Sequence, residues 1–99
     1  MIWGIVIMGN SFVANVELFQ REMGWHYVSV PAELCEPLRK FSDRGLIAVT
    51  VKVGNSNWPT SLLPMGDGTY FIALPAKVRK KENISLGESV EVEFELRIR

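Results

Sequence analysis

The most closely spaced group of charged side chains that could bind a ligand in this sequence is basic. Four positive charges fall within five positions, on Lys77, Arg79, Lys80 and Lys81. In nucleic-acid-binding proteins such a group contacts phosphates, and those contacts supply affinity that does not depend on the base sequence. The other interpretation is a solvated surface, in which Lys80 and Lys81 complement the C-terminal end of a short helix dipole.

Two tryptophans and a serine form a second candidate site, for a small ligand. The rings of Trp25 and Trp58 suit the wall of a pocket or a stacking platform. Large aromatic side chains in a small domain also serve as core or rim packing. Trp58 is the stronger ligand candidate, because it stands close to the hydroxyl of Ser61 in the sequence.

The sequence contains few residues suited to catalysis or to metal binding. His26 is the only histidine and Cys35 the only cysteine, whereas a zinc site needs three or four such ligands. A His26–Cys35 nucleophile pair is one interpretation of these residues. Cys35, however, lies on an apolar stripe, where a small buried hydrophobe is the better interpretation. We expect no metal, no cofactor and no enzymatic activity.

The elements that position these residues occur twice. An apolar strand, Tyr27–Val30, runs into Pro31, and a second one, Phe71–Leu74, runs into Pro75, 44 residues further on. Proline fixes φ at a value that suits the first turn of a helix. An internal repeat of this kind predicts a pseudo-two-fold core built from a single chain.

Alternating apolar residues predict strands with a period of two. The expected strands are Phe12–Phe19, Trp25–Val30, Leu46–Val53, Trp58–Leu63, Thr69–Leu74 and Val90–Ile98. Pro59 favours an edge position for its strand. The expected helices are Ala76–Glu82 and Ala32–Phe41, the latter interrupted by Pro37 and carrying the stripe Leu34, Cys35, Leu38 and Phe41.

This order predicts a mainly β fold, a small double-split β-barrel made from two ββαβ repeats, about 12–53 and 56–98. The two short proline-started helices are expected at opposite ends or flanks. One domain, 12–99, follows an apolar N-terminal segment, 1–11, and Met8 is an alternative start. That segment has no basic residue and is too short to span a bilayer.

Length and charge limit the partners. Ninety-nine residues make one domain. Eleven basic and eleven acidic residues give a net charge of zero, so no global field draws the chain to nucleic acid or to an anionic membrane. A single cysteine excludes an intramolecular disulfide and favours a reducing compartment, so we expect a cytoplasmic protein.

The stretches "HYVSVPAEL", "TSLLPMGDGTYFIALPAKVRKK" and "ISLGESVEVEFEL" resemble the family catalogued as domain of unknown function 1905. The resemblance covers roughly Phe12 to Leu96. It implies a double-split β-barrel, similar in fold to the swapped-hairpin AbrB/MazE-type regulators and antitoxins. In those proteins two chains each donate one strand–proline–helix–glycine–strand unit. Here one chain carries both, which implies a monomeric barrel.

Two functions remain open. The first is a non-catalytic binding module for a protein or a small ligand, using Trp58, Ser61 and Trp25. The alternative is a nucleic-acid-binding regulator that uses Lys77, Arg79, Lys80 and Lys81. The zero net charge, the acidic column Glu91, Glu93 and Glu95, and the lack of a matching basic group in the first repeat favour the binding module. We expect a monomer, or a weak dimer formed through strands at the barrel splits.

Overall fold

The structure is a computed structural model, and it describes residues 10–19 and 25–97. Several sequence predictions lie outside the described residues: most of the N-terminal segment, the alternative start at Met8, the polar turn expected over Gln20–Gly24 between the first two strands, and Ile98 at the end of the final strand. The remaining predictions are compared with the structure below.

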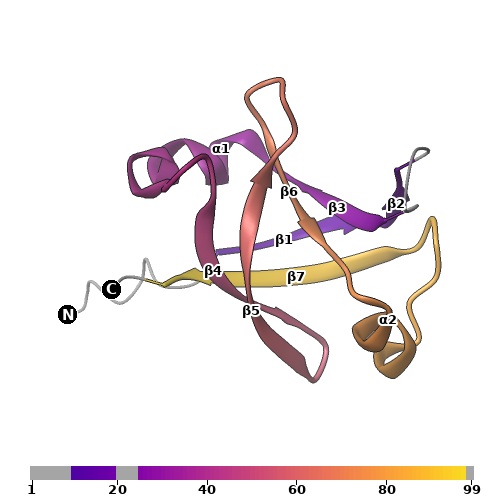
Figure 1. The fold of residues 1–99 in the computed structure, drawn as a ribbon. Helices are drawn as coiled ribbons and strands as arrows, with labels where there is room; N and C mark the ends of the chain where they lie inside the picture. Colours follow the sequence, from indigo (N-terminus) through magenta and orange to yellow (C-terminus); the bar gives the residue numbers. More distant parts are fainter. Residues whose placement is uncertain (1–9, 20–24, 98–99) are drawn as a thin grey trace.

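The chain is mainly β, as predicted, and its described residues form seven strands and two short helical regions (Figure 1). The helical regions are α1 (Ala32–Cys35), which continues directly into the 3₁₀ helix η2 (Glu36–Phe41), and α2 (Ala76–Glu82). The strands are β1 (Asn10–Asn15), β2 (Glu17–Leu18), β3 (His26–Val30), β4 (Ile47–Val53), β5 (Ser56–Pro64), β6 (Tyr70–Ala73) and β7 (Ser89–Leu96).

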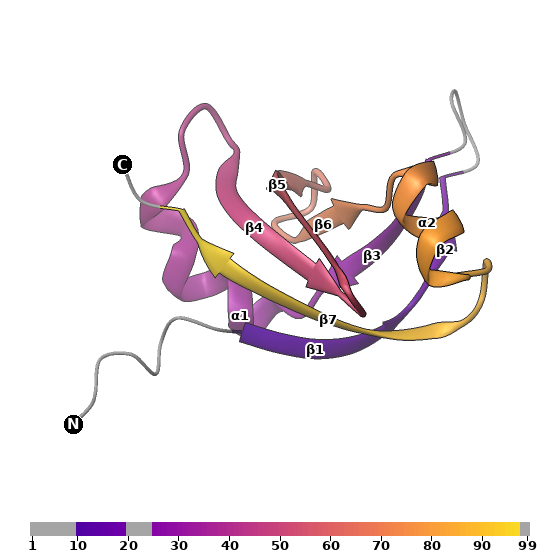
Figure 2. The same cartoon turned by 90° about the horizontal axis from the view of Figure 1, so that it is seen from below.

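The strands form a nearly closed barrel in the order β1-β7-β4-β5-β6-β3-β2. The first and last strands of this order, β1 and β2, are neighbours in the chain and are separated only by Val16. The amide of Val16 donates to the carbonyl of Glu88, and its carbonyl accepts from the amide of Gly87, both at 2.9 Å. The predicted single strand over Phe12–Phe19 is therefore two strands, because the chain leaves β7 at Val16 and joins β3 (Figure 2).

A second strand, β5, also passes between the two halves of the barrel. Its first part pairs with β4 from Ser56 to Leu62, and its end pairs with β6 at Leu63 and Pro64. The predicted edge position is wrong for the strand as a whole. Pro59 is tolerated because it lies where β5 pairs only with β4, so that its missing N–H interrupts no ladder with β6.

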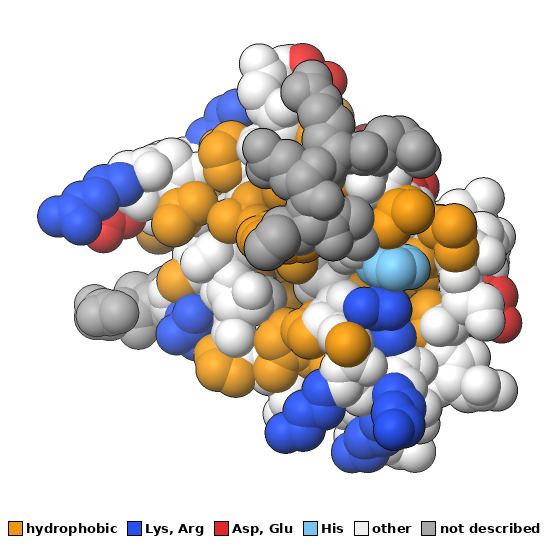
Figure 3. Space-filling model, turned by 45° about the vertical axis from the view of Figure 1, so that its right-hand side comes forward, with side chains coloured by type: hydrophobic (Ala, Val, Ile, Leu, Met, Phe, Trp, Pro, Cys, Tyr) orange, Lys and Arg blue, Asp and Glu red, His pale blue; other side chains and the backbone are white. Residues whose placement is uncertain are grey.

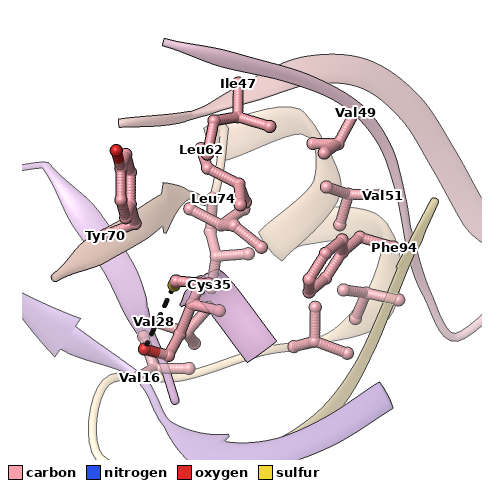
Figure 4. Close-up of a cluster of buried hydrophobic side chains, with 14 residues drawn as sticks. Val16, Val28, Cys35, Ile47, Val49, Val51, Leu62, Tyr70, Leu74 and Phe94 are labelled. Carbon is pink, nitrogen blue, oxygen red and sulfur yellow. Dashed lines mark hydrogen bonds between the residues drawn. The ribbon is translucent and has the colours of Figure 1, made fainter. Parts of the chain in front are cut away.

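The core fills the barrel interior with the inward half of each strand. Val49, Val51 and Phe94 are at most 1% exposed, and they meet across the β4–β7 ladder (Figure 4). This matches the period-two prediction for both strands. Burial of each such side chain contributes about 1.5–3 kcal/mol.

The prolines start the helices as predicted. Pro31 and Pro75 are the N-cap residues of α1 and α2, and their carbonyls accept from the amides of Leu34 and Val78, each at 3.0 Å. Figure 1 shows α1 and α2 at opposite ends of the barrel. Pro37 falls in the first turn of η2, where α-helical bonding has ended, as the expected interruption requires. Phe41, at the end of η2, is 43% exposed and lies off the predicted apolar stripe.

Candidate functional site

The three predicted ligand residues do not meet at one place. Trp58 lies opposite Val51 in the β4–β5 ladder and packs against the core. Ser61 is an odd number of positions away, so strand alternation directs it to the outer face of the sheet. Trp25 immediately precedes β3 and is 47% exposed.

The predicted basic group lies on α2. Lys77, Lys80 and Lys81 are exposed, whereas Arg79 is half-buried. The Nε of Arg79 donates to the carbonyl of Leu74 at 3.0 Å. Among the described residues this is the only hydrogen bond of its guanidinium, which has five N–H donors in all. Both terminal amino groups of the guanidinium therefore remain available.

A cavity of about 330 Å³ brings one residue from each predicted group together. It lies between the start of β3 and the first turn of α2, and its lining is Trp25, His26, Ala73, Leu74, Pro75, Ala76 and Arg79. Figure 3 shows this face of the molecule, with the histidine beside a basic side chain and hydrophobic side chains, and with further Lys and Arg side chains below. The cavity thus combines one fixed cation, one imidazole and an apolar wall.

His26 lines this cavity, and its surroundings favour the neutral imidazole. Its pKa is lowered from the usual value of 6.5, first by burial and then by the positive charge of Arg79. Its Nδ1 is buried and makes no hydrogen bond to any residue that the structure describes. From the sequence alone, His26 is a candidate only for a metal ligand or for a nucleophile pair with Cys35. The signal in the sequence was the 44-residue spacing, which sets His26 against Tyr70.

At the opposite end of the barrel, here called the filled end, the side chains that correspond to Arg79 and His26 are buried. There the Sγ of Cys35 donates to the carbonyl of Val30 at 4.0 Å. Cys35 and Val30 precede Arg79 and Leu74 by 44 residues, the spacing of the two prolines. Cys35 is 0% exposed, and burial raises the pKa of its thiol. The short side chain of Cys35 ends at the Val30 carbonyl. The longer side chain of Arg79 contacts the Leu74 carbonyl through Nε and extends beyond it to the terminal amino groups.

Tyr70 completes the filled end. It occupies the position 44 residues after His26, and it is only 7% exposed. The guanidinium carbon of Arg39 lies 5.7 Å from the centre of the Tyr70 ring. Arg39 also donates to the carbonyl of Gly68 and to Glu36, which it contacts at 3.2 Å. Both of these hydrogen bonds come from one terminal nitrogen, Nη2.

A larger hollow of about 500 Å³ lies beside the β4–β5 hairpin, α2 and the start of β7. Its charged lining is mostly acidic, with Glu82, Glu88, Glu91 and Glu93 against Lys52. Glu82 accepts hydrogen bonds from the Ser56 hydroxyl at 2.6 Å and from the Asn55 amide at 3.3 Å. Within residues 10–19 and 25–97, no three His, Cys, Asp or Glu side chains are grouped so as to hold a metal ion.

An aromatic cluster covers the outer face of β3 and β6. The Phe19 ring stacks on Tyr27 with ring centres 4.1 Å apart, and Phe71 meets both rings edge to face. The Tyr27 hydroxyl donates to Glu17 at 3.3 Å. The pKa of Tyr27 is raised, first by burial and then by the Glu17 carboxylate. These polar groups satisfy one another, so the cluster is explained by packing.

The comparisons with known proteins identify a family for most of the chain. The family described as "Domain of unknown function (DUF1905)" matches residues 12–94. No curated protein matches the chain. No helix among the described residues combines the length and the apolar character needed to cross a membrane.

Proposed function

The chain belongs to the family Domain of unknown function (DUF1905), and we propose that it is a non-catalytic binding module that holds a small ligand at the α2 end of its barrel. We place the ligand in the cavity lined by Trp25, His26 and Arg79. One observation carries the proposal: Arg79 and His26 line a cavity at the α2 end (the hollow end), whereas Cys35 and Tyr70, which occupy the corresponding positions at the α1 end, are buried.

The difference between the ends favours a binding role over simple packing. At the filled end, Cys35 and Tyr70 occupy the positions that correspond to Arg79 and His26 at the hollow end. Small apolar or aromatic side chains are thus compatible with this scaffold. A charged and a titratable side chain at the hollow end cost folding free energy through partial desolvation. A ligand that pairs with these groups offsets that cost.

The strand pairing supports the proposed internal repeat, on which the comparison of the ends depends. Val28 pairs with Ile72, and these residues are 44 positions apart. Val51 pairs with Phe94, and these are equivalent when the repeat is carried past the helices with a shift of one residue. Equivalent residues that pair with each other lie where a pseudo-two-fold axis crosses each ladder. We infer that each half of the chain supplies one copy of the unit.

The test is an NMR screen of the ¹⁵N-labelled chain against a fragment library that contains acids, amines and neutral compounds. We expect binders to shift the Trp25 indole signal and the amides of Ala76 and Arg79. The Arg39→Gln variant, altered at the filled end, serves as the matched control and retains these shifts. A library without a single compound that perturbs these signals would contradict the proposal.

The same screen also tests a second location, at Trp58 and Ser61, the ligand residues expected from the sequence. Trp58 packs on the core with its ring half-buried, so a ligand there requires a rim position on β5. Shifts confined to Trp58 and Ser61 would move the binding site to β5 and would count against the cavity.

The exposed lysines of α2 support a second candidate function, the nucleic-acid-binding regulator. The seven residues of α2 include three exposed lysines, Lys77, Lys80 and Lys81. Arg79, on the same helix, is half-buried. Fluorescence anisotropy with a labelled DNA duplex tests this function at 50 and 200 mM NaCl. Phosphate contacts predict affinity that falls steeply with salt and with Arg79→Ala and Lys80→Ala, whereas Lys52→Ala on β4 leaves it unchanged. An unchanged anisotropy at the lower salt concentration would remove this candidate.

A further inference from the structure

Building on the proposed function, we infer that the ligand of the α2-end cavity is an organic anion in which a negatively charged group is joined to one or two flat rings. The lining supplies a partner for each part. Arg79 offers a cation, Trp25 offers an exposed aromatic ring, and the segment from Ala73 to Ala76 adds apolar surface.

The charge of the ligand follows from the lining. Among the described residues that line the cavity, Arg79 is the one with a fixed charge. Its Nε is held by the Leu74 carbonyl, which anchors the guanidinium and leaves its terminal donors unpaired among the described residues. Guanidinium donors of this kind bind carboxylates and phosphates through paired hydrogen bonds.

The surroundings of α2 point to the same sign. The exposed Lys77 and Lys80 lie near Arg79 in sequence, and within residues 10–19 and 25–97 no acidic side chain lines the cavity. A cationic ligand would meet repulsion here, and a neutral ligand would leave the guanidinium without a partner. The acidic hollow beside the β4–β5 hairpin has the opposite character.

The size of the cavity limits the rest of the ligand. Its volume is about 330 Å³. A protein cavity of roughly 150 Å³ accommodates benzene, so this one has room for a single-ring or two-ring acid. The Trp25 ring and the Pro75 ring supply apolar surface on which a flat ring packs.

The experiment separates the two parts of the ligand by isothermal titration calorimetry with three probes. Benzoate carries ring and charge, benzamide carries the ring alone, and acetate carries the charge alone. We expect benzoate to bind on the order of tenfold more tightly than either, as a charge-assisted hydrogen bond predicts. Phenyl phosphate serves as a fourth probe, and its rank against benzoate assigns the anion as phosphate or carboxylate.

Two variants test the role of Arg79. In Arg79→Gln, benzoate should fall to the affinity of benzamide, and in Arg79→Lys part of the preference should return. The control Arg39→Gln should keep the full preference. A thermal melt of each variant, together with its unchanged benzamide affinity, shows that the cavity is intact.

The outcomes separate this inference from the proposed function. If benzamide binds in the cavity as tightly as benzoate, the cavity is a ligand site but the anionic class is wrong. If neither these probes nor any library compound shifts the Trp25 indole signal, the proposed function fails with the inference.

Discussion

The protonation of His26 and the charge of Arg79 are linked at the residue scale. Both side chains line the same cavity, and the guanidinium lowers the pKa of the imidazole in addition to the effect of burial. An imidazole held neutral near pH 7 donates at one nitrogen and accepts at the other. The site therefore has a single positive charge at neutral pH and gains a second one in acid.

The first prediction concerns the His26 pKa itself. In Arg79→Gln the repulsion disappears, so the pKa of His26 should rise toward 6.5, without reaching it because burial remains. His26 is the only histidine, so its ring signals in an NMR pH titration belong to it alone. An equal titration curve in the wild type and in Arg79→Gln would mean that the two side chains do not interact.

The second prediction concerns stability and pH. The folded state lowers the His26 pKa, so it favours the neutral imidazole. The resulting stabilisation is complete above the unfolded value of 6.5 and is lost as the pH falls through the lower folded value. Urea unfolding between pH 7.5 and 5 should therefore show a decreasing free energy of unfolding. His26→Gln should flatten this slope, because the carboxylates with lowered pKa, Asp67 and Glu82, titrate at more acidic pH.

The β4–β5 hairpin and α2 are joined at the element scale by one carboxylate. Glu82, the last residue of α2, accepts from Ser56 and Asn55 of the hairpin, and these contacts lower its pKa. Gly54 has a positive φ of 60° in the turn of the hairpin, and a side chain there would collide with the Glu82 carboxylate. The close approach of α2 to the hairpin thus depends on a glycine.

The third prediction is that Gly54→Ala displaces Glu82. Alanine at this φ costs about 1–2 kcal/mol by backbone strain alone, and the collision adds to that cost. In a double-mutant cycle with Glu82→Ala, the penalty of Gly54→Ala should therefore be smaller when Glu82 is absent. Chemical denaturation of the four proteins measures it. Additive effects would show that the carboxylate moves aside freely.

The barrel at the scale of the whole molecule depends on side chains from both halves of the chain. Val51 and Phe94 pair directly in the β4–β7 ladder, and both lie in one core with residues of β3, β5 and β6. Because one core serves both halves, neither half can bury its apolar face alone. We expect cooperative, two-state unfolding.

The fourth prediction compares a core residue with an exposed one. Phe94 is 1% exposed, so Phe94→Ala should cost about 3–5 kcal/mol. Leu86, 52% exposed in the turn before β7, is the control, and Leu86→Ala should change stability by less than about 0.5 kcal/mol. Thermal and denaturant unfolding followed by two spectroscopic probes measures both. Separate transitions for the two probes would contradict the single core.

The parts of the fold that the sequence predicted are local. Alternation places Val49 and Val51 inside from their own spacing, and Pro31 and Pro75 start helices through their fixed φ. The division at Val16 was missed because alternation continues on both sides of it, although the strand changes partner there.

The candidate site was harder to predict, because its residues are joined only by tertiary structure. Trp25 and Arg79 are far apart in sequence and were assigned to different hypotheses, although they line one cavity. The grouping of Trp58 with Ser61 rested on nearness in sequence, which strand alternation undoes. The spacing of 44 residues makes Arg79 equivalent to Cys35 and His26 equivalent to Tyr70. This difference in residue type between the two repeats was the signal in the sequence for the site.

The bend at Val16 has a consequence for how the chain folds during synthesis. The strand on its N-terminal side pairs with β7, with Asn10 opposite Phe94. A ribosome makes β1 before the other described strands and β7 after them, so β1 has no ladder partner until β7 has emerged. Pairings of such long sequence separation form slowly. We therefore expect the pairing of β1 with β7, which closes the barrel, to be the last step of folding. Until then β1 and β7 present open strand edges to which other chains can add.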